Sequence, residues 1–244
     1  MAYTRTGLLC ELHAHTTMSD GELTLRELVD LYGRHRFDVL CVTDHCVRRS
    51  DPWLGTEPEH VHAGSYDGYL STIRLEALRA RSLYDLLLVP GLELTYYDAD
   101  PRHAAHAVAV GLRSFVGVDG GLEAALAGAR EAGAALIAAH PYTLAEAGRS
   151  PRGTGRFAED WRELAPQVDR FELFNRHDCF GWVAAERLPF VAAGDFHSHE
   201  HLATWKTLVP CDKDGRALVD YLRSPAPVHV TRFEPERAAP ALAA

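Results

Sequence analysis

The chain has 244 residues, of which 47% are hydrophobic and 24% charged, and its formal net charge is −9. This composition is ordinary for a globular protein with a sizeable core, and the negative charge argues against a surface that neutralises the phosphates of a nucleic-acid duplex. It does not exclude a small phosphorylated substrate, because bound divalent cations reverse the local sign of charge.

The cysteines and the amino-terminal segment predict the environment of the protein. There are five cysteines, an odd number with no Cys-x-x-Cys pair, so the sequence indicates neither a disulfide framework nor a thiolate zinc knuckle. The first six residues lack the stages of a signal peptide, and no apolar run approaches the length of a membrane span. We therefore expect a soluble cytoplasmic protein with no membrane partner, whose oligomeric state the sequence does not determine.

Short apolar segments alternate with segments of helical periodicity along the chain. The predicted strands are residues 8–12, 38–43, 86–94, 107–112, 134–139, 168–174, 190–193 and 228–233. The predicted helices are residues 25–36, 69–84, 122–132, 158–164, 180–187 and 216–223. This alternation, without repeats or a linker, predicts an α/β fold in which residues 1–244 form one βα-barrel domain. Its core would cover residues 8–233, with a flexible tail at residues 236–244.

Nine potential metal ligands lie at the ends of the apolar segments, where βα barrels carry their chemistry. They are His13, His15, Asp20, His45, Glu93, His106, His140, Asp195 and His197. In an extended segment residues i and i+2 point to the same side, so His13 and His15 can reach one ion, and Asp195 and His197 repeat that spacing. A single buried histidine is usually a core residue, but clusters at three strand ends make that interpretation improbable.

Glu93 and His106 need a separate argument, because His106 begins its strand. If the chain turns between Ala99 and Asp100, Glu93 lies directly opposite His106 in an antiparallel hairpin. Directly opposed residues have Cβ atoms roughly 4.5–5.5 Å apart, which suits two ligands of one metal. His103 would then face the other side of the sheet, so His106 is the predicted ligand, provided that the turn is centred there.

The segments that carry these residues closely resemble the PHP (polymerase and histidinol phosphatase) family of metal-dependent phosphoesterases. The matching stretches are ELHAHTTMSDGELT, LCVTDH, PGLEL, HAVAVGL, AAHP, FELFN and AAGDFHSH, and they extend from Glu11 to His199. The resemblance implies a distorted seven-stranded (β/α)7 barrel, similar to a TIM barrel, with up to three metals at its mouth.

Carried over by position, the resemblance also implies how the ligands are shared. The first metal would be bound by His13, His15, Glu93 and Asp195, the second by Glu93, His106 and His140, and the third by Asp20, His45 and His197. Asp44 would orient a ligand or shuttle a proton. The mixed nitrogen and oxygen donors suit two or three divalent ions of zinc, manganese or iron.

The predicted reaction is hydrolysis of a small phosphomonoester, similar to histidinol phosphate, a nucleotide or a sugar phosphate. A hydroxide that bridges two ions would attack phosphorus, and Arg48 and Arg176 would bind the phosphate. For Arg49 a solvated loop position is an equal alternative, and for Cys46 a structural thiol is favoured over a metal contact. Only 33 residues separate His106 from His140, too few for the helical domain of PHP nucleotide phosphatase relatives. A phosphodiester stays open as the substrate.

Two other functions are compatible with the sequence. One is an amidohydrolase-like enzyme that cleaves C–N or C–O bonds with a similar metal site. Such enzymes usually carry a carboxylated lysine at a central strand end, whereas the two lysines here, Lys206 and Lys213, both come late in the chain. The other is a non-catalytic regulatory module that binds metal.

Overall fold

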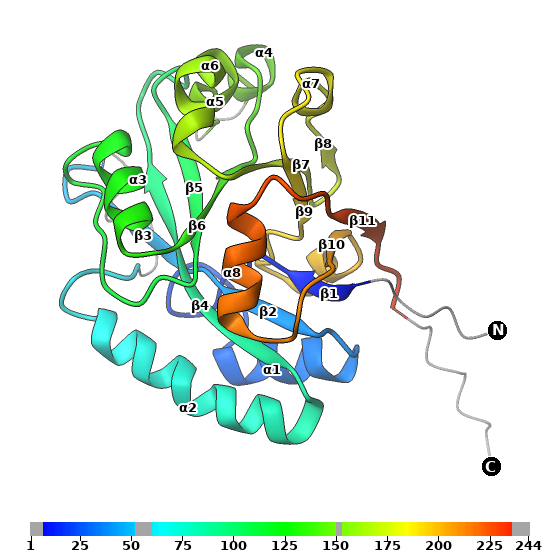
Figure 1. The fold of residues 1–244 in the computed structure, drawn as a ribbon. Helices are drawn as coiled ribbons and strands as arrows, with labels where there is room; N and C mark the ends of the chain where they lie inside the picture. Colours follow the sequence, from blue (N-terminus) through cyan, green and yellow to red (C-terminus); the bar gives the residue numbers. More distant parts are fainter. Residues whose placement is uncertain (1–6, 52–59, 150–152, 236–244) are drawn as a thin grey trace.

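Eleven strands form one curled sheet in the computed structural model, which describes residues 7–51, 60–149 and 153–235 (Figure 1). They are β1 (Leu8–Glu11), β2 (Val39–Val42), β3 (His45–Val47), β4 (Leu87–Tyr96), β5 (Ala105–Val110), β6 (Ala135–Ala139), β7 (Arg170–Asn175), β8 (Asp178–Cys179), β9 (Phe190–Ala193), β10 (Trp205–Val209) and β11 (His229–Arg232). The main path runs β11-β10-β1-β2-β4-β5-β6-β7-β8, with β3 paired to β4 and β9 paired to β7.

The helices cover the outside of this sheet and one end of it. They are α1 (Leu25–Arg34), α2 (Tyr66–Tyr84), α3 (Leu122–Glu131), α4 (Leu144–Ala147), α5 (Arg156–Glu159), α6 (Trp161–Leu164), α7 (Gly181–Ala185) and α8 (Gly215–Arg223). Helix α1 begins at a capping box, in which Thr24 and Glu27 each accept the other's backbone N–H. It buries Leu28, Val29 and Tyr32 beneath it and packs beside α2 (Figure 1).

The sheet curls far enough for its two sides to meet beside the site. A parallel bridge joins Ala14, just after β1, to Phe196, just after β9. The N–H of His15 donates to the oxygen of Phe196 at 2.8 Å, and the N–H of Phe196 donates to the oxygen of His13 at 3.1 Å. The α/β, barrel-like fold predicted from the sequence is therefore confirmed in outline.

The seven-strand count and the regular βα alternation are not confirmed. Strand β5 is antiparallel to both of its neighbours, β4 and β6, and β4 leads to β5 through a hairpin without a helix. The sequence prediction also lacks β10, which pairs with β1, and it joins α5 and α6 into one helix. The single-domain organisation stays a prediction, and the tail at residues 236–244 lies outside the described residues.

Helix α8 fills the end of the barrel away from the predicted ligands. Its residues Leu218, Val219 and Leu222 belong to the apolar cluster that fills the interior of the curl. The helix packs on β4 and β6 (Figure 1) and shares a cavity wall with Val89, at the opposite end of β4 from Glu93. The other end of the barrel is thus left for a polar site.

A buried arginine fixes α8 in this place. Arg170 of β7 is 1% exposed, and its guanidinium donates to the oxygens of Leu222 (2.9 Å), Ser224 (2.8 Å) and Ala226 (2.7 Å). These carbonyls lie at and after the carboxyl end of α8, where a helix leaves acceptors without intrahelical donors.

A fully buried ion pair joins β1 to β10. Lys206 Nζ lies 2.9 Å from Glu11 Oε2, and both side chains are 0% exposed. The same carboxylate accepts the hydroxyl of Tyr32 at 2.9 Å and the N–H of Gly194 at 2.8 Å. A Cβ on Gly194 would lie 2.3 Å from Glu11 Oε2, so only glycine fits here. Glu11 therefore ties three chain segments together.

No helix of the described residues is sufficiently long and apolar to cross a membrane. The cytoplasmic location stays a prediction.

We predict that Lys206→Met lowers the free energy of unfolding by about 3 kcal/mol, because it leaves the Glu11 carboxylate buried without its cation. Lys213→Met is the matched control. It breaks contacts with Asp38 and Asp85 nearer the surface and should cost no more than about 1 kcal/mol. Urea unfolding followed by circular dichroism measures both. Equal stability of the two variants would contradict a structural role for the buried pair.

Candidate metal centre

The nine predicted ligands converge at the open end of the barrel. Seven of them line a cavity of about 360 Å³, together with Tyr97, Tyr142 and Arg176. These seven are Asp20, His45, Glu93, His106, His140, Asp195 and His197. His13 and His15 are fully buried and contact Glu93 and Asp195.

Glu93, near the end of β4, is the centre of the cluster. Its two carboxylate oxygens lie within 3.4 Å of ring nitrogens from five histidines. They are His45 (2.8 Å), His106 (3.0 Å), His140 (3.1 Å), His13 (3.4 Å) and His15 (3.4 Å). No other described carboxylate contacts so many imidazoles.

The first predicted group is assembled around two carboxylates. Asp195 Oδ1 lies 3.5 Å from His13 Nε2 and 3.4 Å from His15 Nε2, on the side where Glu93 also approaches. His13 Nε2, His15 Nε2 and Glu93 Oε2 are buried yet form no hydrogen bond with any described residue. Leaving such atoms without a partner costs free energy, so their convergence fits a bound cation.

The second group consists of His106 and His140 on either side of Glu93. Their rings lie 4.9 Å apart, centroid to centroid, and His106 Nε2 is also buried without a hydrogen-bond partner among the described residues. His140 Nδ1 is held by Thr154 Oγ1 at 3.0 Å, which leaves Nε2 toward Glu93.

The third group is built on the loop that follows β1. Asp20 Oδ1 lies 3.2 Å from His197 Nε2 and 3.5 Å from His45 Nε2. A Cβ on the next residue, Gly21, would lie 2.4 Å from the backbone oxygen of His15, so the tight return of this loop requires glycine.

Asp44 holds the same loop in place. Its Oδ1 accepts the backbone N–H of Thr16 at 2.8 Å and the hydroxyl of Ser19 at 2.7 Å. Asp44 is fully buried, and burial raises the pKa of its carboxyl group. The contacts of Asp44 thus fit the orienting role better than the proton shuttle.

The predicted register of the β4–β5 hairpin was wrong. Glu93 pairs with Val108, and His106 pairs with Thr95, so the turn is centred one residue later than expected. A shift of the centre by one residue moves each partner by two positions, which keeps the same face. Glu93 and His106 therefore still meet, whereas the side chain of His103 is 65% exposed and lies away from the cluster.

Three residues of the centre have a positive φ although none is glycine. They are His140 (28°), Asp195 (44°) and Arg176 (51°). Non-glycine residues adopt this region at a cost, and they concentrate where the surrounding structure determines their position. Here His140 and Arg176 directly follow β6 and β7, and Asp195 lies two residues after the end of β9.

Two histidines of the cluster resist protonation. Burial and the neighbouring imidazoles of His197 and His45 lower the pKa of His15 to about 3. Burial likewise lowers the pKa of His106 to about 4. Both rings are neutral at physiological pH, as a metal ligand must be.

Two other histidines are held by carboxylates. Although burial opposes it, Asp195 and Glu93 raise the pKa of His13 well above its ordinary value. Against burial again, Glu93 raises the pKa of His45. Without metal these rings carry protons, which a cation has to displace, so binding at this centre must strengthen as pH rises.

The candidate phosphate ligands differ in where they lie. Arg176 lines the cavity, with its Nη2 3.1 Å from Asp195 Oδ2. The guanidinium of Arg48 lies over the Tyr96 ring, 4.3 Å from its centroid, and donates to the oxygen of Tyr97. Arg49 is 90% exposed and pairs with Asp119.

Two residues near the ligands have structural surroundings. Cys46 is buried in the apolar cluster outside the sheet, as a structural thiol would be. His201 Nδ1 accepts the backbone N–H of His197 at 3.1 Å and so supports the loop of that ligand.

The sequence prediction missed Glu172, a fully buried carboxylate on β7. Its Oε1 lies 2.9 Å from His13 Nδ1, and its Oε2 accepts the backbone N–H of His140 at 2.7 Å. The available signal was an acidic residue between the apolar residues Phe171 and Leu173 of a strand, where an unpaired charge would be costly.

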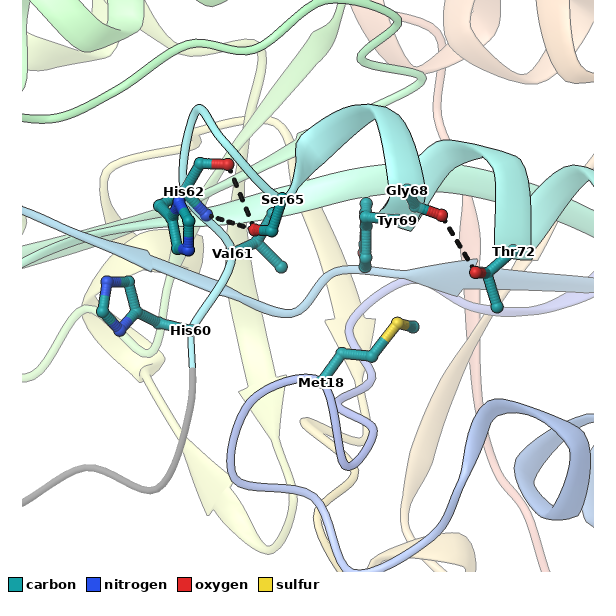
Figure 2. Close-up of a pocket in the computed structure, with 8 residues that line it drawn as sticks. All are labelled: Met18, His60, Val61, His62, Ser65, Gly68, Tyr69 and Thr72. Carbon is teal, nitrogen blue, oxygen red and sulfur yellow. Dashed lines mark hydrogen bonds between the residues drawn. The ribbon is translucent and has the colours of Figure 1, made fainter.

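A second cavity, of about 500 Å³, is lined by Met18, by His60 and His62, and by residues of α2 (Figure 2). Met18 belongs to the loop that also carries Asp20. The N–H of Val61, which also lines this cavity, donates to the oxygen of His45 at 2.8 Å and so ties the cavity wall to the strand β3.

Comparisons with known proteins support the fold. No protein-family model and no curated protein sequence matches the chain. A two-domain protein from Bacteroides vulgatus ATCC 8482, containing a predicted PHP-like metal-dependent phosphoesterase, is similar in structure with a TM-score of 0.65 and 19% identity. The alignment covers 93% of this chain and 65% of that protein, so the chain spans about two thirds of its length.

Two further structures are similar over 78% of this chain and 88% of theirs. One, from Bifidobacterium adolescentis ATCC 15703, is described as a metal-dependent phosphoesterase and has a TM-score of 0.51 at 16% identity. The other is an amidohydrolase from Chromobacterium violaceum with bound sulfate and no metal, with a TM-score of 0.52 at 15% identity. The resemblance to PHP proteins is thus confirmed in the fold.

We predict that removing metal destabilises the protein. Manganese or zinc at about 100 times its Kd should stabilise the chelator-treated protein by about 2.7 kcal/mol, which raises Tm by about 5–10 °C for a chain of this size. This gain should shrink from pH 8 to pH 6, as protons compete for His13 and His45. Differential scanning calorimetry measures it.

His106→Ala and His103→Ala form the matched pair for this experiment. His106→Ala should lose part of the gain in Tm, and His103→Ala should keep all of it. No gain in the unaltered protein with either metal would contradict a metal centre.

Proposed function

We propose that this chain, which shares its fold with PHP-like metal-dependent phosphoesterases, is a metal-dependent hydrolase that cleaves the phosphate ester of a small substrate. The observation that carries the proposal is the set of five imidazoles around Glu93, together with five buried ligand atoms that form no hydrogen bond within the described residues. They are His13 Nε2, His15 Nε2, Asp20 Oδ1, Glu93 Oε2 and His106 Nε2.

The three groups of ligands would hold two or three divalent ions of zinc, manganese or iron, since neutral imidazoles and carboxylates suit all three metals. When bound, such ions supply Lewis-acid stabilisation of phosphoryl oxygens and lower the pKa of water to about 7. Glu93 would bridge the first and second groups, because its Oε1 faces His13, His106 and His140.

Arg176 is the side chain that would contact the phosphate. Its backbone conformation and its bonds to Asp195 and His197 hold the guanidinium at the cavity, and 34% of the side chain is exposed. A planar guanidinium binds phosphate oxygens through two parallel N–H groups. Arg48 would lie at the margin, because it is already engaged with Tyr96 and Tyr97.

The cavity volume favours a small phosphomonoester, such as histidinol phosphate, a nucleotide or a sugar phosphate. A volume of about 360 Å³ is at the lower end of the range for small-molecule sites. The phosphate would occupy the part next to the metals and Arg176, which leaves room for a compact leaving group.

A second candidate function is hydrolysis of C–N or C–O bonds, favoured by the amidohydrolase among the structural neighbours. The surroundings of Lys206 argue for phosphorus chemistry instead. Its Nζ is bound to Glu11, Thr204 and the oxygen of His201, and it has no contact with the nine ligands among the described residues. A carboxylated lysine that bridges metals would need to lie among them.

We predict that Glu93→Gln lowers phosphate release from an aryl phosphate by at least about 100-fold, since even the partners of metal ligands cost 10–100-fold when lost. Glu186→Gln, at an exposed position after α7, should retain full activity. A colorimetric phosphate assay with added manganese measures both. The same assay on mononucleotides, sugar phosphates and histidinol phosphate selects the substrate class. Turnover confined to amides or lactones would instead support the second candidate.

We predict that Arg176→Met lowers kcat/KM for the best phosphomonoester by about 10–100-fold, the effect of losing a charged hydrogen bond of about 1.5–3 kcal/mol. Arg49→Met removes an equally charged but highly exposed guanidinium and should leave kcat/KM unchanged. Metal content, measured in parallel, separates loss of phosphate binding from disturbance of Asp195. Equal kinetics for the two variants would remove Arg176 from the site.

A further inference from the structure

Glu172 is a buried carboxylate that contacts two residues of the candidate metal centre from outside the cavity. It is fully buried on β7 and contacts residues of two ligand groups: His13 of the first and His140 of the second. Its remaining partner is Asn175, whose Nδ2 donates to Oε2 at 2.7 Å. Three donors thus surround one carboxylate that does not itself line the cavity.

The strand is irregular where Glu172 lies. Glu172 pairs with Val191 and Phe174 pairs with Ala192, so Leu173 is an extra residue in β7. Such a bulge re-aims the neighbouring side chains, and bulges are frequent next to active sites. Here the chain on either side of the bulge presents Glu172 and Asn175 to each other.

We propose that Glu172 is a positioning residue that holds both His13 and His140 in place, and so couples binding at the first metal position to binding at the second. This inference rests on the proposed metal-dependent function.

The contact with His13 determines which ring nitrogen faces the metals. A ligand imidazole binds through one nitrogen and donates the N–H of the other, usually to a carboxylate. Nδ1 of His13 lies 2.9 Å from Glu172 Oε1, whereas Nε2 faces Glu93 and Asp195 and is without a hydrogen bond. Glu172 thus selects the tautomer with a proton on Nδ1, which leaves Nε2 free to bind a cation.

The contact with His140 acts on the backbone instead of the ring. His140 has a φ of 28°, which a non-glycine residue adopts at a cost in free energy. The 2.7 Å bond from its N–H to Glu172 Oε2 offsets part of this cost. The imidazole then reaches Glu93, with Nε2 3.1 Å from Oε1.

The third group has no such link. Within the described residues, Glu172 forms no hydrogen bond or ion pair with Asp20, His45 or His197. A carboxylate needed only for folding would affect all three groups alike, whereas a positioning residue affects the first two selectively.

The test is a zinc titration of Glu172→Gln followed residue by residue. An amide keeps the size of the side chain but cannot accept from both His13 and the N–H of His140 as the carboxylate does. In protein labelled with ¹⁵N-histidine, imidazole signals of His13 and His140 report the first two groups, and those of His45 and His197 report the third. Competition with a chromophoric chelator gives the affinities, and Glu186→Gln is the matched control.

We expect His13 of the zinc-loaded unaltered protein to carry its proton on Nδ1. In Glu172→Gln the zinc midpoints of His13 and His140 should shift to 10–100-fold higher free zinc, while those of His45 and His197 stay within about threefold. A proton on Nε2 of His13, or an equal shift at all four histidines, overturns the inference.

If Glu172→Gln does not fold, Asn175→Ala tests the positioning role of Glu172 instead. It removes one donor to the carboxylate and should produce a smaller shift confined to His13 and His140, whereas a uniform shift or none overturns the inference. The readout is independent of turnover. A protein with the selective zinc effect but no phosphate release from any ester overturns the proposed function alone.

Discussion

The open end of this barrel depends on one carboxylate. Glu93 lies in contact with five imidazoles that come from four separate chain segments, because His13 and His15 share one. Buried polar atoms without partners are costly, so such a cluster is maintained only where the surrounding chain determines each position. Three features of the chain fix these positions. They are the bridge between Ala14 and Phe196, the hydrogen bonds of Asp44 to the loop after β1, and the positive φ values of His140 and Asp195.

The free energy that offsets this arrangement comes from elsewhere in the molecule. The interior of the curl is apolar down to α8, and α8 is held by the guanidinium of Arg170. The pair of Glu11 and Lys206 lies between the two regions. Glu11 Oε1 accepts the N–H of Gly194, one residue before Asp195, and also lies 3.3 Å from the backbone nitrogen of His13. The scaffold and the ligands are therefore connected through backbone hydrogen bonds.

The sequence predicted which side chains gather at the open end of the barrel better than it predicted the strands that carry them. His13, Glu93 and Asp195 could be found because a polar residue at the end of an apolar strand is a local signal. Because side chains alternate between the two faces of a strand, Glu93 and His106 still share a face and meet, although the predicted turn was displaced by one residue and the predicted pairing was wrong.

Other features depend on contacts between distant segments and could not be predicted. β10 was missed because a lysine is typical of a surface segment. Only the ion pair with Glu11 explains why Lys206 is buried. Glu172 was not considered a partner of His13, since 158 residues lie between them in the sequence. The orientation of the Arg48 guanidinium depends on its contact with the Tyr96 ring. That ring is placed by the length of β4, of which Tyr96 is the last residue.

In the proposed function, Asp195 would link the metals to the substrate. Its Oδ1 faces His13 and His15, and its Oδ2 faces the guanidinium of Arg176. An arginine bound in this way is already oriented before a phosphate arrives, so less side-chain entropy is lost on binding. The same contact partly neutralises Asp195, and a cation at the first position would share that carboxylate with Arg176. If Arg176 binds phosphate and Asp195 binds metal as proposed, the two binding events would therefore be coupled through this ion pair.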